Sequence, residues 1–148
     1  MFGAAKKQEP TADPRVQSVL DKLELRYQID DDGDFRVGFE LESGRHQSAF
    51  IRSRTYEFLG IEIREISSAG LVSQGPFDAR TANILLVQNE QLKIGAWGVS
   101  ANSEDVHAAI FTVKIAAELP AQEFLGVLMT VLNTADNMEA RLSGRDDF

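Results

Sequence analysis

The spacing of apolar residues changes period several times along this chain, and these changes restrict the fold more than any other feature of the sequence. Helical spacing marks 14–23, 79–89 and 120–142, whereas apolar and polar residues alternate in the segments between them. A chain that switches in this way predicts an α+β domain, with a mostly antiparallel sheet and helices packed on one face. The expected order is α-β-β-β-β-α-β-β-α, with strands at 25–29, 35–41, 47–53, 58–66, 92–99 and 106–115.

Capping residues and loop-forming residues set the expected boundaries of these elements. Asp13 followed by Pro14 is typical of a helix start, and Asp78 can cap the second helix. The serines, glycines and proline of 67–76 predict a loop between the meander and that helix. With 148 residues the chain is expected to form one domain, which we place at 14–142, with flexible tails at 1–13 and 143–148.

Charge and cysteine content exclude several classes of function. The net charge of −8 and the lack of a basic patch argue against nucleic-acid binding. There are no cysteines, which removes disulfides, thiol nucleophiles and thiolate metal sites. No apolar run is long enough for a membrane helix, and Lys6 and Lys7 are not followed by an apolar stretch typical of a signal peptide. A cytoplasmic location without membrane attachment is therefore expected.

The motifs that would support catalysis or metal binding are missing or fail on spacing. Carboxylates in 30–34 suggest a calcium loop, but no register of that loop places both its glycine and its final glutamate correctly, so a hairpin turn is predicted instead. His46 and His107 fall in no recognisable triad, and there is no glycine-rich phosphate loop. The sequence predicts neither an enzyme nor a bound metal or cofactor.

Four residues are the candidates for binding a partner. Arg52 and Arg54 lie on the polar face of the predicted meander, where charged residues alternate with apolar ones and either form cross-strand pairs or recognise an anion. Trp97 lies between Gly95 and Gly98, so a ligand or a partner could reach it, although packing in the core explains the same pattern. Asn89 could bind a backbone strand or cap its helix. The charged residues of that polar face are Arg36, Glu40, Glu42, Arg52, Arg54, Glu62 and Arg64.

The element order and three short motifs resemble the YbjN-domain family over about 14–142. These motifs are 25–34, which ends in aspartates, 84–92 leading into Trp97, and 133–136 in the last helix. The family is similar in fold to type III secretion chaperones, which are small acidic α+β proteins that pair as homodimers and hold an extended client. The resemblance implies a binding protein of the regulatory or chaperone type, and a homodimer. The strand expected at 58–66 is additional to the three strands of a secretion chaperone's first sheet.

Two hypotheses for function follow. The first is a non-catalytic protein-interaction module that binds a polypeptide client through its sheet and helix surfaces, with strand addition at a sheet edge as one mode of binding. The alternative is a small-molecule sensor with a pocket between the C-terminal helix and the sheet, near Trp97 and Phe111.

Overall fold

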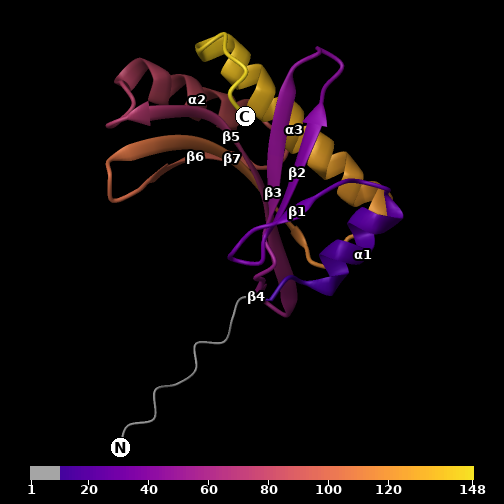
Figure 1. Ribbon diagram of the computed structural model, residues 1–148. Coiled ribbons are helices and arrows are strands. Elements are labelled where there is room, and N and C mark those ends of the chain that lie inside the picture. Colours follow the sequence, from indigo (N-terminus) through magenta and orange to yellow (C-terminus); the bar gives the residue numbers. More distant parts are fainter. Residues whose placement is uncertain (1–10) are drawn as a thin grey trace, which may run out of the picture.

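The computed structural model describes residues 11–148 and confirms the predicted α+β class and element order, with one short strand added (Figure 1). A seven-stranded antiparallel sheet has the order β1-β2-β3-β5-β7-β6, and β4 pairs with β5 beside this path. The elements are α1 (Pro14–Lys22), β1 (Gln28–Ile29), β2 (Phe35–Glu40), β3 (His46–Ile51), β4 (Tyr56–Phe58), β5 (Ile61–Gln74), α2 (Ala79–Gln91), β6 (Ala96–Ala101), β7 (Val106–Ala116) and α3 (Ala121–Leu142).

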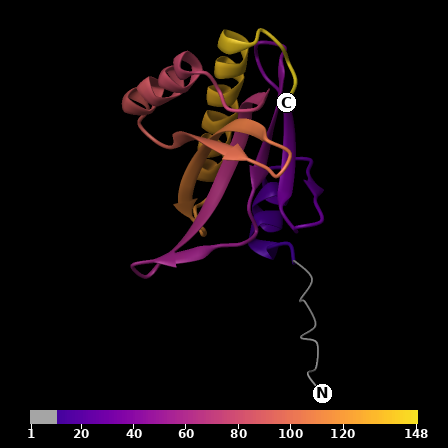
Figure 2. The ribbon, with the colours of Figure 1, turned by 90° about the vertical axis from the view of Figure 1, so that its left-hand side faces the viewer.

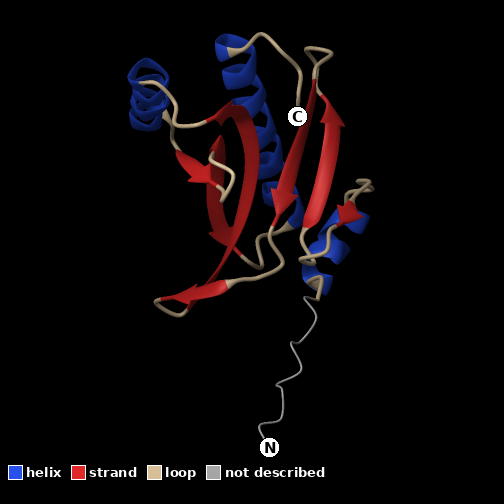
Figure 3. Ribbon diagram, turned by 60° about the vertical axis from the view of Figure 1, so that its left-hand side comes forward, coloured by secondary structure: helices blue, strands red, loops and turns tan. Residues whose placement is uncertain are grey.

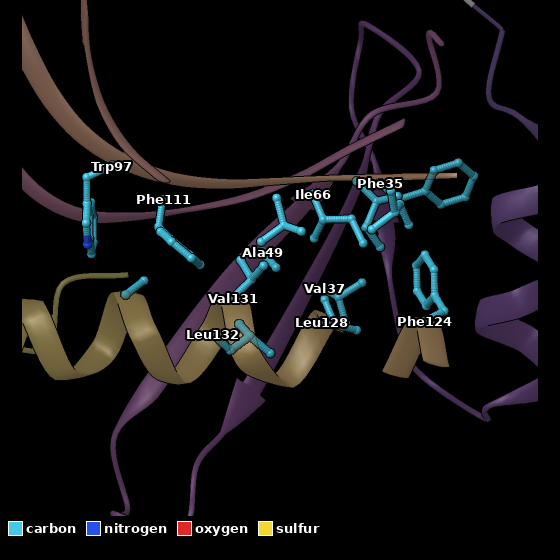
Figure 4. Close-up of a cluster of buried hydrophobic side chains, with 14 of the residues drawn as sticks. Phe35, Val37, Ala49, Ile66, Trp97, Phe111, Phe124, Leu128, Val131 and Leu132 are labelled. Atoms are coloured by element: carbon cyan, nitrogen blue, oxygen red, sulfur yellow. The ribbon is translucent and has the colours of Figure 1, made fainter. Parts of the chain in front are cut away.

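The core lies between α3 and the inner face of the sheet, as the close-up in Figure 4 shows. Along α3 the buried residues recur at intervals of three and four, which is the spacing of one helix face. The strands contribute every second residue to the same layer, because successive side chains of a strand point to opposite faces. The buried core includes Phe35, Val37, Ala49, Ile66, Trp97, Phe111, Phe124, Leu128, Val131 and Leu132.

Two of the helices begin where the sequence predicts. The Asp13 side chain accepts a hydrogen bond from Arg15 N, and Pro14 takes the first helical position of α1. Asp78 caps α2 by accepting from Thr81 N, at 2.7 Å. These bonds satisfy amide groups at the helix start that have no partner within the helix.

The predicted loop at 67–76 is wrong, because β5 continues as a strand to Gln74. Its pairing with β7 extends over eleven residue pairs, with an irregularity between Ala69 and Leu71. The intervening Gly70 lies beneath Trp97, and a Cβ at this position would come within 2.6 Å of the indole ring. The small residues that suggest a loop are therefore required for the close approach of a tryptophan to a continuous strand.

The predicted strand at 58–66 is divided between the end of β4 and the start of β5, and the inward face of this segment is also different from the expected one. Ile61 is 53% exposed, whereas the Arg64 side chain is 1% exposed, although the sequence places it on the solvated face. Asp13 supplies a buried anion for Arg64, which makes its burial possible.

Among residues 11–148, no helix covers the opposite face of the sheet (Figures 1 and 3). Register aligns Phe50, Ser67, Thr112 and Ala96 across four neighbouring strands on this side. We call this side the open face, because these side chains point away from α3. The same face also carries Arg36, which is aligned with Phe50, and the ion pair of Glu65 with Lys114, so the open face combines small, apolar and charged side chains.

The C-terminal segment packs against the body of the protein. Most of the tail predicted at 1–13 lies outside the described residues. The segment 143–148, for which the sequence predicts a flexible tail, returns to the body of the protein beside the β2–β3 hairpin (Figure 2). There Asp147 N donates to Glu139 Oε1 and His46 N donates to Asp146 Oδ1, at 2.6 and 3.0 Å.

Candidate interaction surface

A projecting β-hairpin is the most exposed apolar feature of the described residues. It is formed by β4 and the first residues of β5, and we call residues 56–63 the arm. Tyr56 pairs with Ile63 and Phe58 pairs with Ile61, so the arm is a short antiparallel ladder. Figures 2 and 3 show that it extends away from the helices and from the other strands.

One face of the arm is apolar, and it continues the open face of the sheet. The exposed fractions are 65% for Phe58 and 53% for Ile61, and Tyr56 is 42% exposed. These side chains and that of Ile63 share one side, because paired residues in an antiparallel ladder point to the same face. Two-stranded hairpins have little stability of their own in water, so an apolar face on one favours contact with another surface.

The turn of the arm has an unusual residue at its tip. Leu59 and Gly60 have φ angles of 52° and 79°, the left-handed combination of a type I′ hairpin turn. This turn favours asparagine, aspartate or glycine, because other side chains clash with their own backbone at positive φ. Leu59 is nevertheless 85% exposed there. Neither turn geometry nor core packing accounts for a leucine at this position.

The base of the arm is fixed by polar contacts on its other face. Arg15 binds both carboxylate oxygens of Glu62, at 2.7 and 2.8 Å, and Thr55 Oγ1 donates to the same carboxylate. These contacts lower the pKa of Glu62 to about 2. On the apolar side Tyr56 donates its hydroxyl to Glu65, and burial together with this bond raises the pKa of Tyr56 to about 12. The arm therefore leaves the body in a defined direction.

Beneath the arm lies a buried ion pair that joins α1 to the sheet. Arg64 Nη2 is 2.6 Å from Asp13 Oδ2, and Arg64 Nη1 donates to the carbonyl oxygens of Arg52 and Ser53. Burial alone would raise the pKa of Asp13, but hydrogen bonds from Arg15 and Arg64 hold it well below its usual range. This network makes the base of the arm rigid.

The predicted candidates Arg52 and Arg54 both line a hollow of about 720 Å³ at the base of the arm, together with Tyr56. Arg52 Nη1 donates to Asp34 Oδ2 at 2.6 Å, so its charge is already shared with an acid. Asp34 Oδ1 also accepts from Ser53 N at 2.8 Å, which holds the 30–34 turn against the end of β3. Arg54 is exposed, and the lining also includes the acids Asp32, Asp34 and Glu65, so the hollow carries charges of both signs next to the apolar arm.

The other two candidates, Trp97 and Asn89, meet each other but not the arginines. Asn89 Oδ1 accepts from Trp97 N at 2.7 Å, and its Nδ2 donates to the Trp97 carbonyl at 3.2 Å. The indole N–H donates to Gln88, and its ring packs against Phe111 with a centroid separation of 5.5 Å. Trp97 is 5% exposed, so its side chain is a core residue.

This contact decides how the edge strand β6 can be used. Asn89 occupies the backbone N–H and carbonyl of Trp97 on the side away from β7, where an added strand would bind. By the alternation of the ladder, Val99 and Ala101 direct their backbone groups to the same outer side. Strand addition at this edge is therefore limited to the last half of β6.

The space between α3 and the sheet is filled where the sensor hypothesis places a pocket. Trp97 and Phe111 pack there with Gly70 and Gly95, and a Cβ on Gly95 would come within 2.6 Å of the Phe111 ring. Neither aromatic residue lines the hollows described on the surface. The packing of Trp97 and Phe111 thus explains Gly70 and Gly95 without a ligand, whereas a Cβ at Gly98 would meet no atom within 4 Å.

Comparison with known proteins adds no family to this picture. No protein-family model matches the chain, and no curated protein matches its sequence. Within residues 11–148, none of the helices combines the length and the apolar character needed to cross a bilayer.

The arm is the candidate functional feature that the sequence analysis missed. The expected strand at 58–66 hides it, because Leu59, Ile61 and Ile63 fit the alternation of a half-buried strand. One signal could have revealed it. Gly60 sits between two alternating runs, as the second residue of a two-residue hairpin turn does.

Proposed function

We propose that this protein is a non-catalytic interaction module, chaperone-like or regulatory, that binds a polypeptide partner. The observation that carries the proposal is the arm, which presents Phe58, Leu59 and Ile61 to solvent on a rigid base. Apolar side chains that are exposed in this way contribute nothing to the core, but they supply a large contact area when a partner covers them.

The proposed partner is an extended segment with apolar side chains. These side chains would pack on the arm and on the adjoining open face. A lipid surface is a poorer occupant for the same arm, because a chain with a net charge of −8 is repelled by anionic headgroups.

The resemblance to the YbjN-domain family and to type III secretion chaperones supports the same reading, with the protein acting in the cytoplasm as a homodimer. Strand addition is the weaker of the two modes of binding, since Asn89 occupies part of the β6 edge. The arm and the open face are accordingly the proposed docking surface.

The test uses the full chain and a defined unfolded polypeptide. A fluorescein-labelled, reduced and carboxymethylated globular protein is titrated with the wild type, and its anisotropy is measured. Phe58→Ser is expected to weaken binding at least about tenfold, because it removes a large aromatic contact from an exposed site. The matched control is Leu86→Gln, which removes a 61% exposed apolar side chain from α2.

The two variants make the proposal falsifiable. Equal affinity of Phe58→Ser and the wild type would refute the arm as the docking surface, and so would an equal loss in Leu86→Gln. Val99→Pro removes an outward N–H from the β6 edge, so a loss in this variant alone would move the site to strand addition. Light scattering of the free protein tests the proposed homodimer separately.

A further inference from the structure

Three carboxylates from distant parts of the chain meet at the end of the molecule that carries the C-terminus. Asp136 and Glu139 lie one turn apart on α3, and Asp146 follows in the returning C-terminal segment. One oxygen of each lies within 4.8 Å of an oxygen of the other two. The Asp136 and Glu139 side chains are 5% and 1% exposed, so this is a buried acidic cluster.

A separate hydrogen bond orients each carboxylate through one of its two oxygens. Arg45 Nε donates to Asp136 Oδ1 at 2.7 Å, Asp147 N to Glu139 Oε1 at 2.6 Å, and His46 N to Asp146 Oδ1 at 3.0 Å. Outer contacts of this kind hold carboxylate ligands in place around metal ions. Of the second oxygens, Asp146 Oδ2 lies 3.5 Å from His46 Nδ1 and Glu139 Oε2 lies 3.4 Å from Arg45 Nη2, and neither distance is that of a short charged hydrogen bond.

The second oxygen of Glu139 provides independent evidence that this cluster can bind a ligand. Glu139 Oε2 is buried and has no hydrogen-bond donor among the described residues. Its ion-pair partner is Arg45 Nη2 at 3.4 Å, and this nitrogen donates instead to the Arg145 carbonyl. A buried carboxylate oxygen without a donor is unfavourable, and a cation would relieve it.

The local charge balance also favours a cation. The Arg45 guanidinium pairs with Asp136 and Glu139, and the cationic partner of Asp146 is the His46 ring at 3.5 Å, so one guanidinium stands against three carboxylates. Glu139 also lies at the C-terminal end of α3, because its main-chain carbonyl accepts hydrogen bonds from Ser143 N and Gly144 N. The helix dipole repels anions and attracts cations at this end.

We propose that Asp136, Glu139 and Asp146 bind a calcium ion. Oxygen ligands in an irregular arrangement suit calcium, which accepts six to eight of them with flexible geometry. Asp146 keeps the site partly open, with 37% of its side chain exposed, so water can complete the coordination. The ion takes the place of Arg45 Nη2 beside Glu139 and fastens the C-terminal segment to α3 and to the β2–β3 hairpin.

The full chain is first treated with a chelator, which is then removed. Calorimetry measures the binding of added calcium, and thermal unfolding is compared with and without calcium. The wild type is expected to bind one equivalent of calcium and to melt at a higher temperature when calcium is present, because the ion binds only the folded state. Magnesium and zinc are titrated in parallel. A preference for either of these ions over calcium would overturn the assignment.

Glu139→Gln is the decisive variant, and Glu123→Gln in the first turn of the same helix is its matched control. Glu139→Gln is expected to weaken calcium binding at least about tenfold. Without calcium it should fold as well as the wild type, because it buries no charge. Absence of calcium binding in the wild type, or equal binding in both variants, would overturn the proposal.

Discussion

Replacing Leu59 by asparagine separates two effects of the residue at the tip of the arm, its effect on the stability of the turn and its contact with a partner. Leu59 holds a φ of 52° and is 85% exposed, so it pays the cost of left-handed backbone without gaining any packing. That cost is about 1 kcal/mol for an ordinary side chain, and asparagine avoids most of it because its side chain bonds locally. We therefore expect Leu59→Asn to stabilise the fold by roughly 0.5–1 kcal/mol.

For a chain of 148 residues this corresponds to a rise in Tm of roughly 1–4 °C. The same variant is expected to lose affinity for the unfolded polypeptide, because it removes an apolar contact. Leu59→Ala is the control, since alanine retains the backbone strain but lacks the large side chain. It should bind as weakly as Leu59→Asn and melt close to the wild type.

Denaturant unfolding and anisotropy titrations of the three proteins check these expectations. A lower unfolding midpoint for Leu59→Asn would refute the strain argument, because it would mean that the leucine stabilises the fold. Unchanged affinity in both variants would refute the role of the side chain in binding. A gain in stability together with a loss of binding is the signature of a residue retained for function at a cost to the fold.

Three further predictions concern the interior. Asp13→Asn is expected to destabilise the protein by about 3 kcal/mol in denaturant unfolding, since it leaves the buried Arg64 guanidinium without an anion. The folded pKa of Asp13 is depressed, so its contribution to the free energy of unfolding is present above a pH of about 4 and is lost as the pH falls through the folded pKa. Asp13→Asn should therefore flatten the acid limb of a plot of stability against pH. Gly70→Ala is expected to cost about 1–3 kcal/mol and to shift the fluorescence of Trp97, whereas Gly98→Ala, where a Cβ meets no atom within 4 Å, should leave both unchanged.

Local signals in the sequence predict much of this fold. Asp13 and Asp78 identify two helix starts, because a cap acts on amides only two or three residues away. The alternation in 35–41 predicts β2 and its inward face. The helical spacing from Phe124 onward predicts the buried face of α3.

The errors occur where distant residues decide the local structure. The serines and glycines near Gly70 suggest a loop, because the sequence does not show that β7 and Trp97 lie beside them. Arg64 suggests a solvated face because its anion, Asp13, is 51 residues away in the chain. Of the candidate site, Arg52 and Arg54 are found at the arm, but the arm itself is concealed by its strand-like pattern.

Leu59 at the tip of the arm and Glu139 in the acidic cluster lack the complementary contacts that the interior provides. This contrast favours these two places as functional sites. Arg64, which is the largest fully buried side chain, has an anion and two carbonyl oxygens as partners. Pairing the buried guanidinium of Arg64 is a more demanding requirement than placing asparagine at position 59 or glutamine at position 139. Asparagine at position 59 would favour the free protein, and glutamine at position 139 would leave its stability unchanged. Each substitution removes a group for which a bound partner or ion is a better use than any contact within the protein. The two sites are also made of different chemistry, apolar at the arm and anionic at the C-terminus, so a failure of one proposal leaves the other standing.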